Sequence, residues 1–232
     1  MARGVWMQRF ARWHIWLGWL VGVPVVMWLV SGLLMVITPI EEVRGNHLRI
    51  EVEEPALPPD TNIAVALPDD PSRPVKSVTT AMERGKVVTT ITYADDSIER
   101  YNSAGEAIAP ITDVEARMIV REGIKGGDRV ASVQSFDADA VPFDFRRPVD
   151  VWQVTLEDGT RIYVNRQTGV IEAVRTRWWR FFDFLFGLHV MDLETREPGP
   201  NPWVLVFSTL AVLGATLGCI LMFRRRKARV TA

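Results

Sequence analysis

The residues best suited to chemistry in this 232-residue chain are its three histidines. His189 follows Trp178, Phe182 and Leu185 at helical spacing, so a helix over residues 178–191 places the imidazole on an apolar stripe. An imidazole in such a place meets lipid headgroups, a partner helix or a metal ion. The simplest interpretation is an interfacial helix whose histidine reaches water at a membrane surface, and a ligand role is the alternative.

His14 lies beside Arg12 and close to Trp16, which is typical of the headgroup region of a membrane. A ligand role is again the alternative, and His47 is expected to be solvated. The sequence contains no glycine-rich phosphate loop, no cluster of metal ligands and no pair of nucleophile and base. Ser31, for example, has no neighbouring acid or base in the sequence. No catalytic residue is therefore expected.

Two long uncharged stretches are predicted to cross a membrane. Residues 15–40 form one stretch of 26 residues, and residues 202–223 form another of 22. At about 1.5 Å per residue, each helix is long enough for a hydrocarbon core of about 30 Å. The first stretch is longer than the apolar part of a cleaved signal peptide, and no small-residue cleavage site follows it. We therefore expect transmembrane helices over 15–40 and 201–223.

Charge is distributed unevenly, although the formal net charge is only −1. All 28 acidic residues lie between Glu41 and Glu197, together with 19 of the 27 lysines and arginines. The remaining eight basic residues lie in the tails, 1–14 and 224–232. Basic residues beside spans stay in the cytoplasm, so we expect a two-pass protein of the bacterial inner membrane with both termini inside and a periplasmic middle. This arrangement argues against binding to nucleic acid.

The middle of the chain divides into a tether and a domain. Residues 41–75 are rich in proline and acidic residues, which predicts an extended segment. Residues 76–176 have the alternation and the turn residues of antiparallel strands, and Thr112 is the expected N-cap of a helix over 113–124. The expected strands are 87–93, 98–102, 129–136, 150–156, 161–165 and 170–174.

The domain contains an internal similarity between 76–111 and 112–176. The segment TYADDSIERYNSAGEAIA from Thr92 resembles TLEDGTRIYVNRQTGVIEA from Thr155, and the spacing of the matched residues is nearly the same in both. Each copy consists of a hairpin, an asparagine, a glycine turn and an apolar strand. A duplication predicts two units that share one core, and the alternative is that two unrelated hairpins look alike.

The second unit resembles a PepSY domain. The resemblance lies in a strand, an Asp-Gly turn, a strand with an aromatic residue, and an Asx turn that ends in glycine. The matching residues are Asp158, Gly159, Tyr163, Asn165, Thr168 and Gly169, with Asn165 where the family more often has Asp. The first span, RWHIWLGWLVGVPVVMWLVSGLLMV, is similar to the PepSY-associated transmembrane helix, and FLFGLHVMDL before a second span fits the same family.

The resemblance covers most of the chain and implies an α+β membrane protein. Two transmembrane helices flank a periplasmic domain made of an antiparallel sheet and a helix. An amphipathic interfacial helix within 177–200 precedes the second span.

The resemblance also implies a cofactor. Larger members of the family have four spans and are associated with haem-dependent reduction of ferric siderophores, which makes His14 and His189 the implied ligands of haem b. The two histidines are expected on opposite sides of a layer about 30 Å thick, whereas two axial nitrogens on one iron lie only about 4 Å apart. One chain therefore cannot place both on the same iron, and haem would need a homodimer or a partner that supplies ligands.

Each span contains two glycines at the GxxxG spacing, Gly18 with Gly22 and Gly214 with Gly218. Small residues at this spacing allow helix backbones to approach closely. The pairs predict helix packing, either of one span on the other or of two chains, although this motif is common by chance in apolar segments.

We therefore interpret the chain as an accessory, assembly or regulatory subunit of a larger membrane complex, in iron or metal uptake or in electron transfer as the resemblance implies. Its expected contacts are membrane lipid and other integral membrane subunits or a second copy. The expected docking surface is the apolar face of Trp178, Phe182 and Leu185. The absence of a catalytic constellation favours a protein that is not an enzyme and needs no cofactor. One alternative is a haem b oxidoreductase component that passes electrons across the membrane, and another is an inhibitor or sensor of a protease or cell-wall enzyme.

Overall fold

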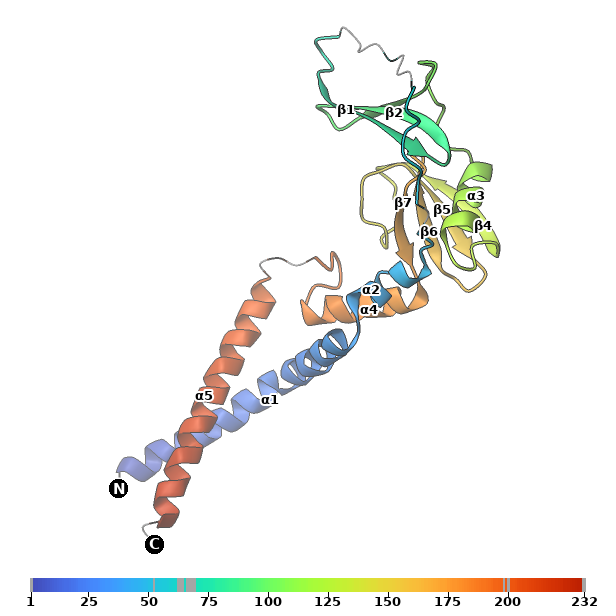
Figure 1. The fold of residues 1–232 in the computed structure, drawn as a ribbon. Helices are drawn as coiled ribbons and strands as arrows, with labels where there is room; N and C mark the ends of the chain where they lie inside the picture. The colour runs from blue at the N-terminus through green and yellow to red at the C-terminus, as the bar shows by residue number, and fades with distance from the viewer. Residues whose placement is uncertain are drawn as a thin grey trace. The chain divides into compact units, whose positions relative to one another are not determined.

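The computed structural model describes residues 2–51, 53–61, 65, 70–197, 199 and 201–230 (Figure 1). The chain forms two compact units. We call Met1–Val43 with Trp178–Ala232 the helical unit and Arg44–Arg177 the β domain. Residues 52, 62–64 and 66–69 of the expected tether lie outside the described part of the chain.

Two long helices dominate the helical unit. α1 (Ala2–Ile37) and α5 (Pro202–Val230) pack against each other, with the N-terminal end of α1 and the C-terminal end of α5 at the same end of the pair (Figure 1). Within them, Trp6–Ile37 and Pro202–Phe223 are long and apolar enough to cross a membrane, and few of their residues are buried in the protein. Apolar helices that protein does not cover are solvated by lipid.

Two shorter helices complete the helical unit. α2 (Ile40–Val43) follows Pro39, whose ring prevents α1 from continuing without a break. α4 (Arg177–His189) is amphipathic, with Asp183 and Gly187 buried while Phe181 and Phe184 are exposed. The expected helix before the second span is therefore present.

The second sheet of the β domain is covered on both faces. Its strands β4 (Val130–Phe136), β5 (Val151–Leu156), β6 (Arg161–Asn165) and β7 (Ile171–Arg175) pair antiparallel in that order. α3 (Asp113–Gly123) packs Ala116 and Val120 into an apolar core on one face. A loop over 137–149 covers the other face with Phe145, whose ring stacks on Tyr163 at a centroid distance of 4.7 Å.

The start of α3 is fixed by a capping box. The Thr112 hydroxyl accepts a hydrogen bond from the Glu115 backbone N–H at 3.2 Å, and the Glu115 carboxylate accepts one from the Thr112 N–H at 2.8 Å. Two amides that the helix leaves unpaired are thus satisfied. The prediction of Thr112 as the N-cap is confirmed.

The first sheet contains β1 (Val75–Glu83), β2 (Lys86–Tyr93) and β3 (Ile98–Asn102), antiparallel in that order. β2 and β3 match expected strands, whereas β1 was not expected from the sequence. A short 3₁₀ turn, η1 (Asn46–Leu48), lies earlier in the β domain. Residues 53–61 and 70–74, which precede β1, contain no helix. The central α+β domain between two membrane helices is confirmed.

The two sheets have the same pairing register. Val88 pairs with Asn102 between β2 and β3, and Val151 pairs with Asn165 between β5 and β6. Val88 and Val151 are separated by the same number of residues as Asn102 and Asn165. Positions in one hairpin therefore have direct equivalents in the other.

The outer strands of the two sheets also correspond. β1 has one irregularity, between Val75 and Ser77, and β4 has one between Val130 and Ser132. Each irregularity thus lies at the first paired residues of its strand. A bulge at the same place in both strands supports a common origin for the two sheets.

The turn after each hairpin is built in the same way. The Asn102 side-chain oxygen accepts hydrogen bonds of 2.9 and 3.0 Å from following backbone amides, and the Asn165 oxygen accepts two of 2.8 and 3.0 Å. Gly105 and Gly169 then adopt positive φ angles of 80° and 72°. A left-handed conformation favours glycine, which explains why both turns use it.

Candidate functional site

His14 lies between the two long helices. Its Nδ1 is 3.0 Å from the carbonyl oxygen of Gly214 on α5. A Cβ built on Gly218 would lie only 2.9 Å from the imidazole Cε1. The glycine pair of α5 therefore makes the space that the imidazole occupies.

His189 ends α4 and contacts α1 in the same manner. Its Nδ1 lies 2.9 Å from the hydroxyl of Ser31, and the Trp28 indole N–H donates to the His189 carbonyl at 2.9 Å. A Cβ on Gly32 would lie 3.3 Å from the imidazole Cε1. Ser31, for which the sequence indicated no partner, is thus a contact of the second histidine.

The hydrogen bonds decide which ring nitrogen carries hydrogen. The Gly214 carbonyl can only accept, so His14 donates through Nδ1. The Ser31 hydroxyl donates its hydrogen to the Met27 carbonyl at 2.7 Å, so it accepts from Nδ1 of His189. In a neutral imidazole Nε2 then keeps its lone pair, which is the form that binds a metal or accepts a proton.

The two imidazoles are far apart along α1. His14 belongs to α1, and His189 contacts α1 at Ser31, which lies several turns further along the helix. At a rise of about 1.5 Å per residue, the helix between positions 14 and 31 covers about 26 Å. They form two separate sites rather than one pair of ligands.

Polar contacts hold the end of α4 in place. Asp183 is buried on α4 and forms an ion pair of 2.7 Å with Arg196, which also packs over Gly187. The Asn201 side chain donates to the carbonyls of Val190 and Met191 at 3.0 and 2.9 Å. These residues position His189 without contacting its ring. A lone aspartate within an apolar helix is the only signal in the sequence that could have revealed them.

Comparison with known families identifies the chain. A family model described as the PepSY-associated TM region matches residues 11–232, which include both histidines and all four glycines discussed above. The chain belongs to this family. The resemblance found in the sequence is therefore confirmed, whereas no curated protein and no solved structure matches the chain.

The glycine pairs of this PepSY-associated protein have different surroundings. Gly214 lies under Leu17 and Gly218 under His14, so the α5 pair packs against α1. Among the residues that the structure describes, a Cβ built on Gly18 or Gly22 would meet no atom within 4 Å. The structure thus brings His14 together with the α5 glycines and leaves the α1 glycines open.

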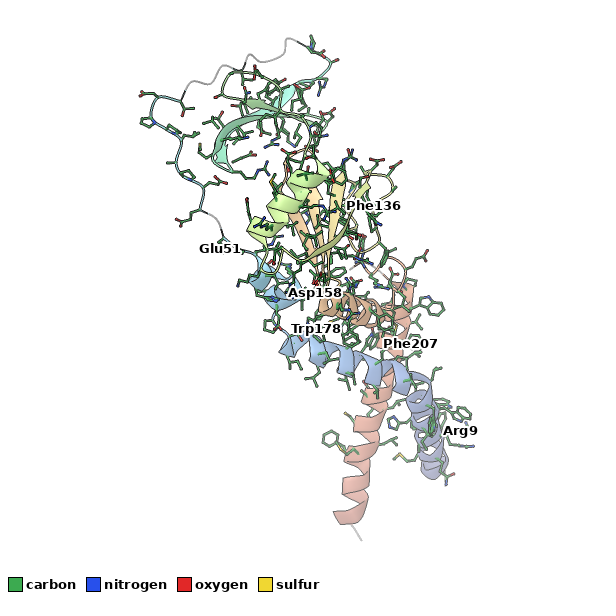
Figure 2. The ribbon with its side chains drawn as sticks, turned by 90° about the vertical axis from the view of Figure 1, so that its right-hand side faces the viewer. Arg9, Glu51, Phe136, Asp158, Trp178 and Phe207 are labelled. Atoms are coloured by element: carbon green, nitrogen blue, oxygen red, sulfur yellow. The ribbon has the colours of Figure 1, made fainter. Side chains whose placement is uncertain are left out.

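The expected docking face on α4 is partly covered. Trp178 is 38% exposed and lies 5.5 Å from the ring of Phe181, while Phe182 and Leu185 are half-buried. The N-terminal end of α1 has its own aromatic group around Arg9, whose guanidinium lies 5.6 Å from the Trp6 ring (Figure 2). A docking role for the α4 face stays a prediction.

The β domain contains a buried polar cluster on the second sheet. The Tyr163 hydroxyl donates to the Asp144 carboxylate at 2.6 Å and accepts from Gln153 at 2.6 Å. Arg161 lies 3.0 Å from the same carboxylate, and Arg175 donates to the Asp144 carbonyl at 2.7 Å. Burial and the bond to Asp144 raise the pKa of Tyr163. The cluster fastens the loop over 137–149 to the sheet.

A second polar cluster lies on the first sheet. The hydroxyls of Tyr101 and Tyr93 donate to Glu99 at 2.7 Å, and Arg73 lies 2.8 Å from its other oxygen. These bonds, that of Tyr101 foremost, lower the pKa of Glu99 to about 2. The bond to Glu99 raises the pKa of Tyr93 to about 12. Neither cluster resembles a nucleophile with its base, and the described residues contain no group of three His, Cys, Asp or Glu that could hold a metal ion.

Proposed function

We propose that this PepSY-associated protein is an accessory subunit that joins a larger membrane complex through an open face of α1. One observation carries the proposal: the α5 glycines are filled by α1, but nothing within the described chain fills Gly18 and Gly22. A groove of small residues on a spanning helix is a place where another helix can approach closely. The occupant is a helix of another integral membrane protein.

The setting of such a complex follows from the family. Iron or metal uptake, or electron transfer, is the context that the resemblance suggests. The antiparallel packing of α1 and α5 supports a topology with both basic tails in the cytoplasm and the β domain in the periplasm. The β domain then faces the space from which metal complexes arrive.

Native mass spectrometry after extraction in mild detergent tests the proposal. The wild-type chain is expected to appear in complex with a second integral membrane protein. The double variant Gly18→Leu, Gly22→Leu is expected to appear without it. Val23→Phe is the matched control, because Val23 is 78% exposed on a different side of α1 and should tolerate added bulk. Loss of the partner in both variants, or in neither, contradicts docking through the groove.

A second candidate, a haem b component for electron transfer, is favoured by the imidazole hydrogen bonds. His14 and His189 each hold Nδ1–H against a protein oxygen, so Nε2 is the atom through which each would hold a haem iron, although Nε2 of His14 lies close to Gly218, where a Cβ would be 3.3 Å away. A bound haem would supply one-electron transfer. Because the places where the two rings contact α1 are separated by about 26 Å along the helix, each site requires its second ligand from another chain. If the wild-type chain is a homodimer and the glycine substitutions dissociate it into monomers, the result favours this candidate over the accessory role.

The absorbance spectrum of the purified protein tests the second candidate. Reduced Soret and α bands that His14→Ala and His189→Ala each diminish are the expected result. Ser31→Ala keeps the His189 ring but removes its hydrogen-bond acceptor, so it should shift the reduction potential and leave a band. A colourless protein overturns this candidate.

A further inference from the structure

The second sheet of the β domain has two edges, and the described residues cover only one of them. At β7, the Arg49 guanidinium donates two hydrogen bonds of 3.1 Å to the Ile171 carbonyl. Gly45 lies so close to Val174 that a Cβ there would be 2.9 Å from its Cγ1. At Val130–Phe136, within the described chain, the only hydrogen bonds are those to β5. β4 therefore presents a free row of backbone N–H and C=O groups.

β4 also lacks the residues that usually protect an exposed edge. Its sequence, VASVQSF, contains no charged residue and no proline. One of the two edge strands of the first sheet, β1, contains Lys76 and Glu83, and Lys76 lies 2.6 Å from the Asp96 carboxylate. Charged side chains on an edge strand oppose pairing with another strand. Both strands begin with a bulge, so the absence of charge is what leaves β4 more open to pairing than β1.

The side chains of β4 define what can lie beside it. Val133 faces α3 and packs on the core, whereas Ser132 and Gln134 are exposed on the opposite face. Phe136, at the end of the strand, is half-buried beside the loop over 137–149 (Figure 2). An added strand places an apolar side chain beside Val133 and small polar side chains beside Ser132 and Gln134.

We propose that β4 binds an extended, uncharged peptide segment, which adds a fifth strand to the second sheet. Main-chain hydrogen bonds provide the affinity, and the alternation of side chains provides the selectivity. This binding site goes beyond the accessory role of the helical unit. It uses a different surface, so either proposal can fail alone.

Hydrogen exchange of the full-length protein in detergent tests the site. The probe is a synthetic peptide, acetyl-Thr-Val-Thr-Val-Thr-Val-Thr-amide, which is uncharged and alternates as the edge requires. At a probe concentration about ten times its Kd, mass action predicts about tenfold slower exchange of exposed β4 amides. Slowing is expected over Val130–Phe136 and not over Val75–Glu83.

Two equivalent substitutions provide a matched comparison. Gln134 on β4 and Thr79 on β1 are both exposed and occupy the same register position after the bulge of each strand. Gln134→Lys is expected to abolish the slowing, and Thr79→Lys is expected to leave it intact. Unchanged protection of α3 and β6 verifies that both variants are folded, and Gln134→Thr should behave as the wild type.

Three results overturn the proposal. The first is no slowing at β4 with the wild-type chain at saturating probe. The second is equal slowing in Gln134→Lys and the wild type. The third is β4 protection that rises with protein concentration without the probe, which shows that the edge pairs with a second copy instead.

Discussion

The two sheets of the β domain have one backbone plan and two different surfaces. On the face that α3 covers, the second sheet has Ile162, and the equivalent position of the first sheet has Glu99. At the neighbouring positions of this face, Leu156 and Val164 correspond to Tyr93 and Tyr101, whereas Val154 corresponds to another buried apolar residue, Ile91. The two sheets therefore share one strand register, and they differ in the side chains on the face that α3 covers in the second sheet.

This difference predicts which of the two sheets contributes more to the stability of the β domain. The second sheet has a helix on one face, an anchored loop on the other and an apolar core between them. The first sheet instead places a carboxylate among two hydroxyls and a guanidinium. Buried Arg100 joins the sheets, because it forms an ion pair with Glu83 and donates to the Gln167 carbonyl at 2.8 Å. We expect the second sheet to be the stable part.

The largest effect is expected from removing core volume in the second sheet. Ile162→Ala should lower the free energy of unfolding by about 2–5 kcal/mol, because a cavity replaces packed atoms. Glu99→Ala, at the equivalent position, removes a partly exposed ion pair and the acceptor of the Tyr93 and Tyr101 hydroxyls but leaves no cavity in an apolar core, so it should cost less than Ile162→Ala. Hydrogen exchange of the slowest β6 amides measures both. Equal losses contradict the unequal roles of the sheets.

The second largest effect is expected from removing Asp144, which anchors the loop over 137–149 to the second sheet. Asp144→Ala leaves the buried Tyr163 hydroxyl without its acceptor, which should cost about 1–3 kcal/mol. Exchange in the loop over 137–149 should increase more than exchange in the first sheet. Asp139→Ala changes an exposed aspartate of the same loop and should have no measurable effect. A loop that exchanges equally in both variants shows that Asp144 is not its anchor.

The third largest effect is expected from removing the N-cap of α3. Thr112→Ala removes the hydroxyl that accepts from Glu115, and loss of an N-cap costs about 1 kcal/mol. Since α3 packs on the second sheet, the effect should appear in α3 and in that sheet. Thr112→Ser preserves the acceptor and should restore wild-type exchange. Greater loss of protection in β2 than in β5 contradicts this assignment.

The smallest effect should be the response of the first sheet to acid. Folding lowers the pKa of Glu99 from 4.5 to about 2, so its contribution to stability is present above pH 4.5 and is lost as the pH falls towards 2. Solvent screening keeps this contribution small. Exchange of β2 and β3 amides, corrected for intrinsic rates, should accelerate over this range in the wild type but less in Glu99→Gln. Identical profiles show that Glu99 does not control the response.

Local patterns predicted much of this fold. Uncharged length predicted both spans, and the Thr112 cap and the turns at Asn102 and Asn165 predicted where elements begin and end. β1 was missed because its Ser, Thr and Lys residues give an edge strand little apolar alternation. Its existence depends on pairing with β2, which is a non-local contact.

The candidate site was less predictable. The two glycine pairs have the same spacing, and only the packing of α1 on α5 separates filled Gly214 and Gly218 from open Gly18 and Gly22. His14 and His189 could be selected from the sequence, but their hydrogen-bond partners lie 200 and 158 residues away. Contacts at such distances leave no local signal.

Cysteine labelling tests the central claim, that two membrane helices hold the β domain outside the cytoplasm, most directly. In a chain whose only cysteine is removed by Cys219→Ser, Ala104→Cys marks the β domain and Gln8→Cys marks the N-terminal end of α1. In spheroplasts, a membrane-impermeant maleimide is expected to label Ala104→Cys at once and Gln8→Cys only after lysis. Labelling of Gln8→Cys without lysis, with Ala104→Cys protected, contradicts the account.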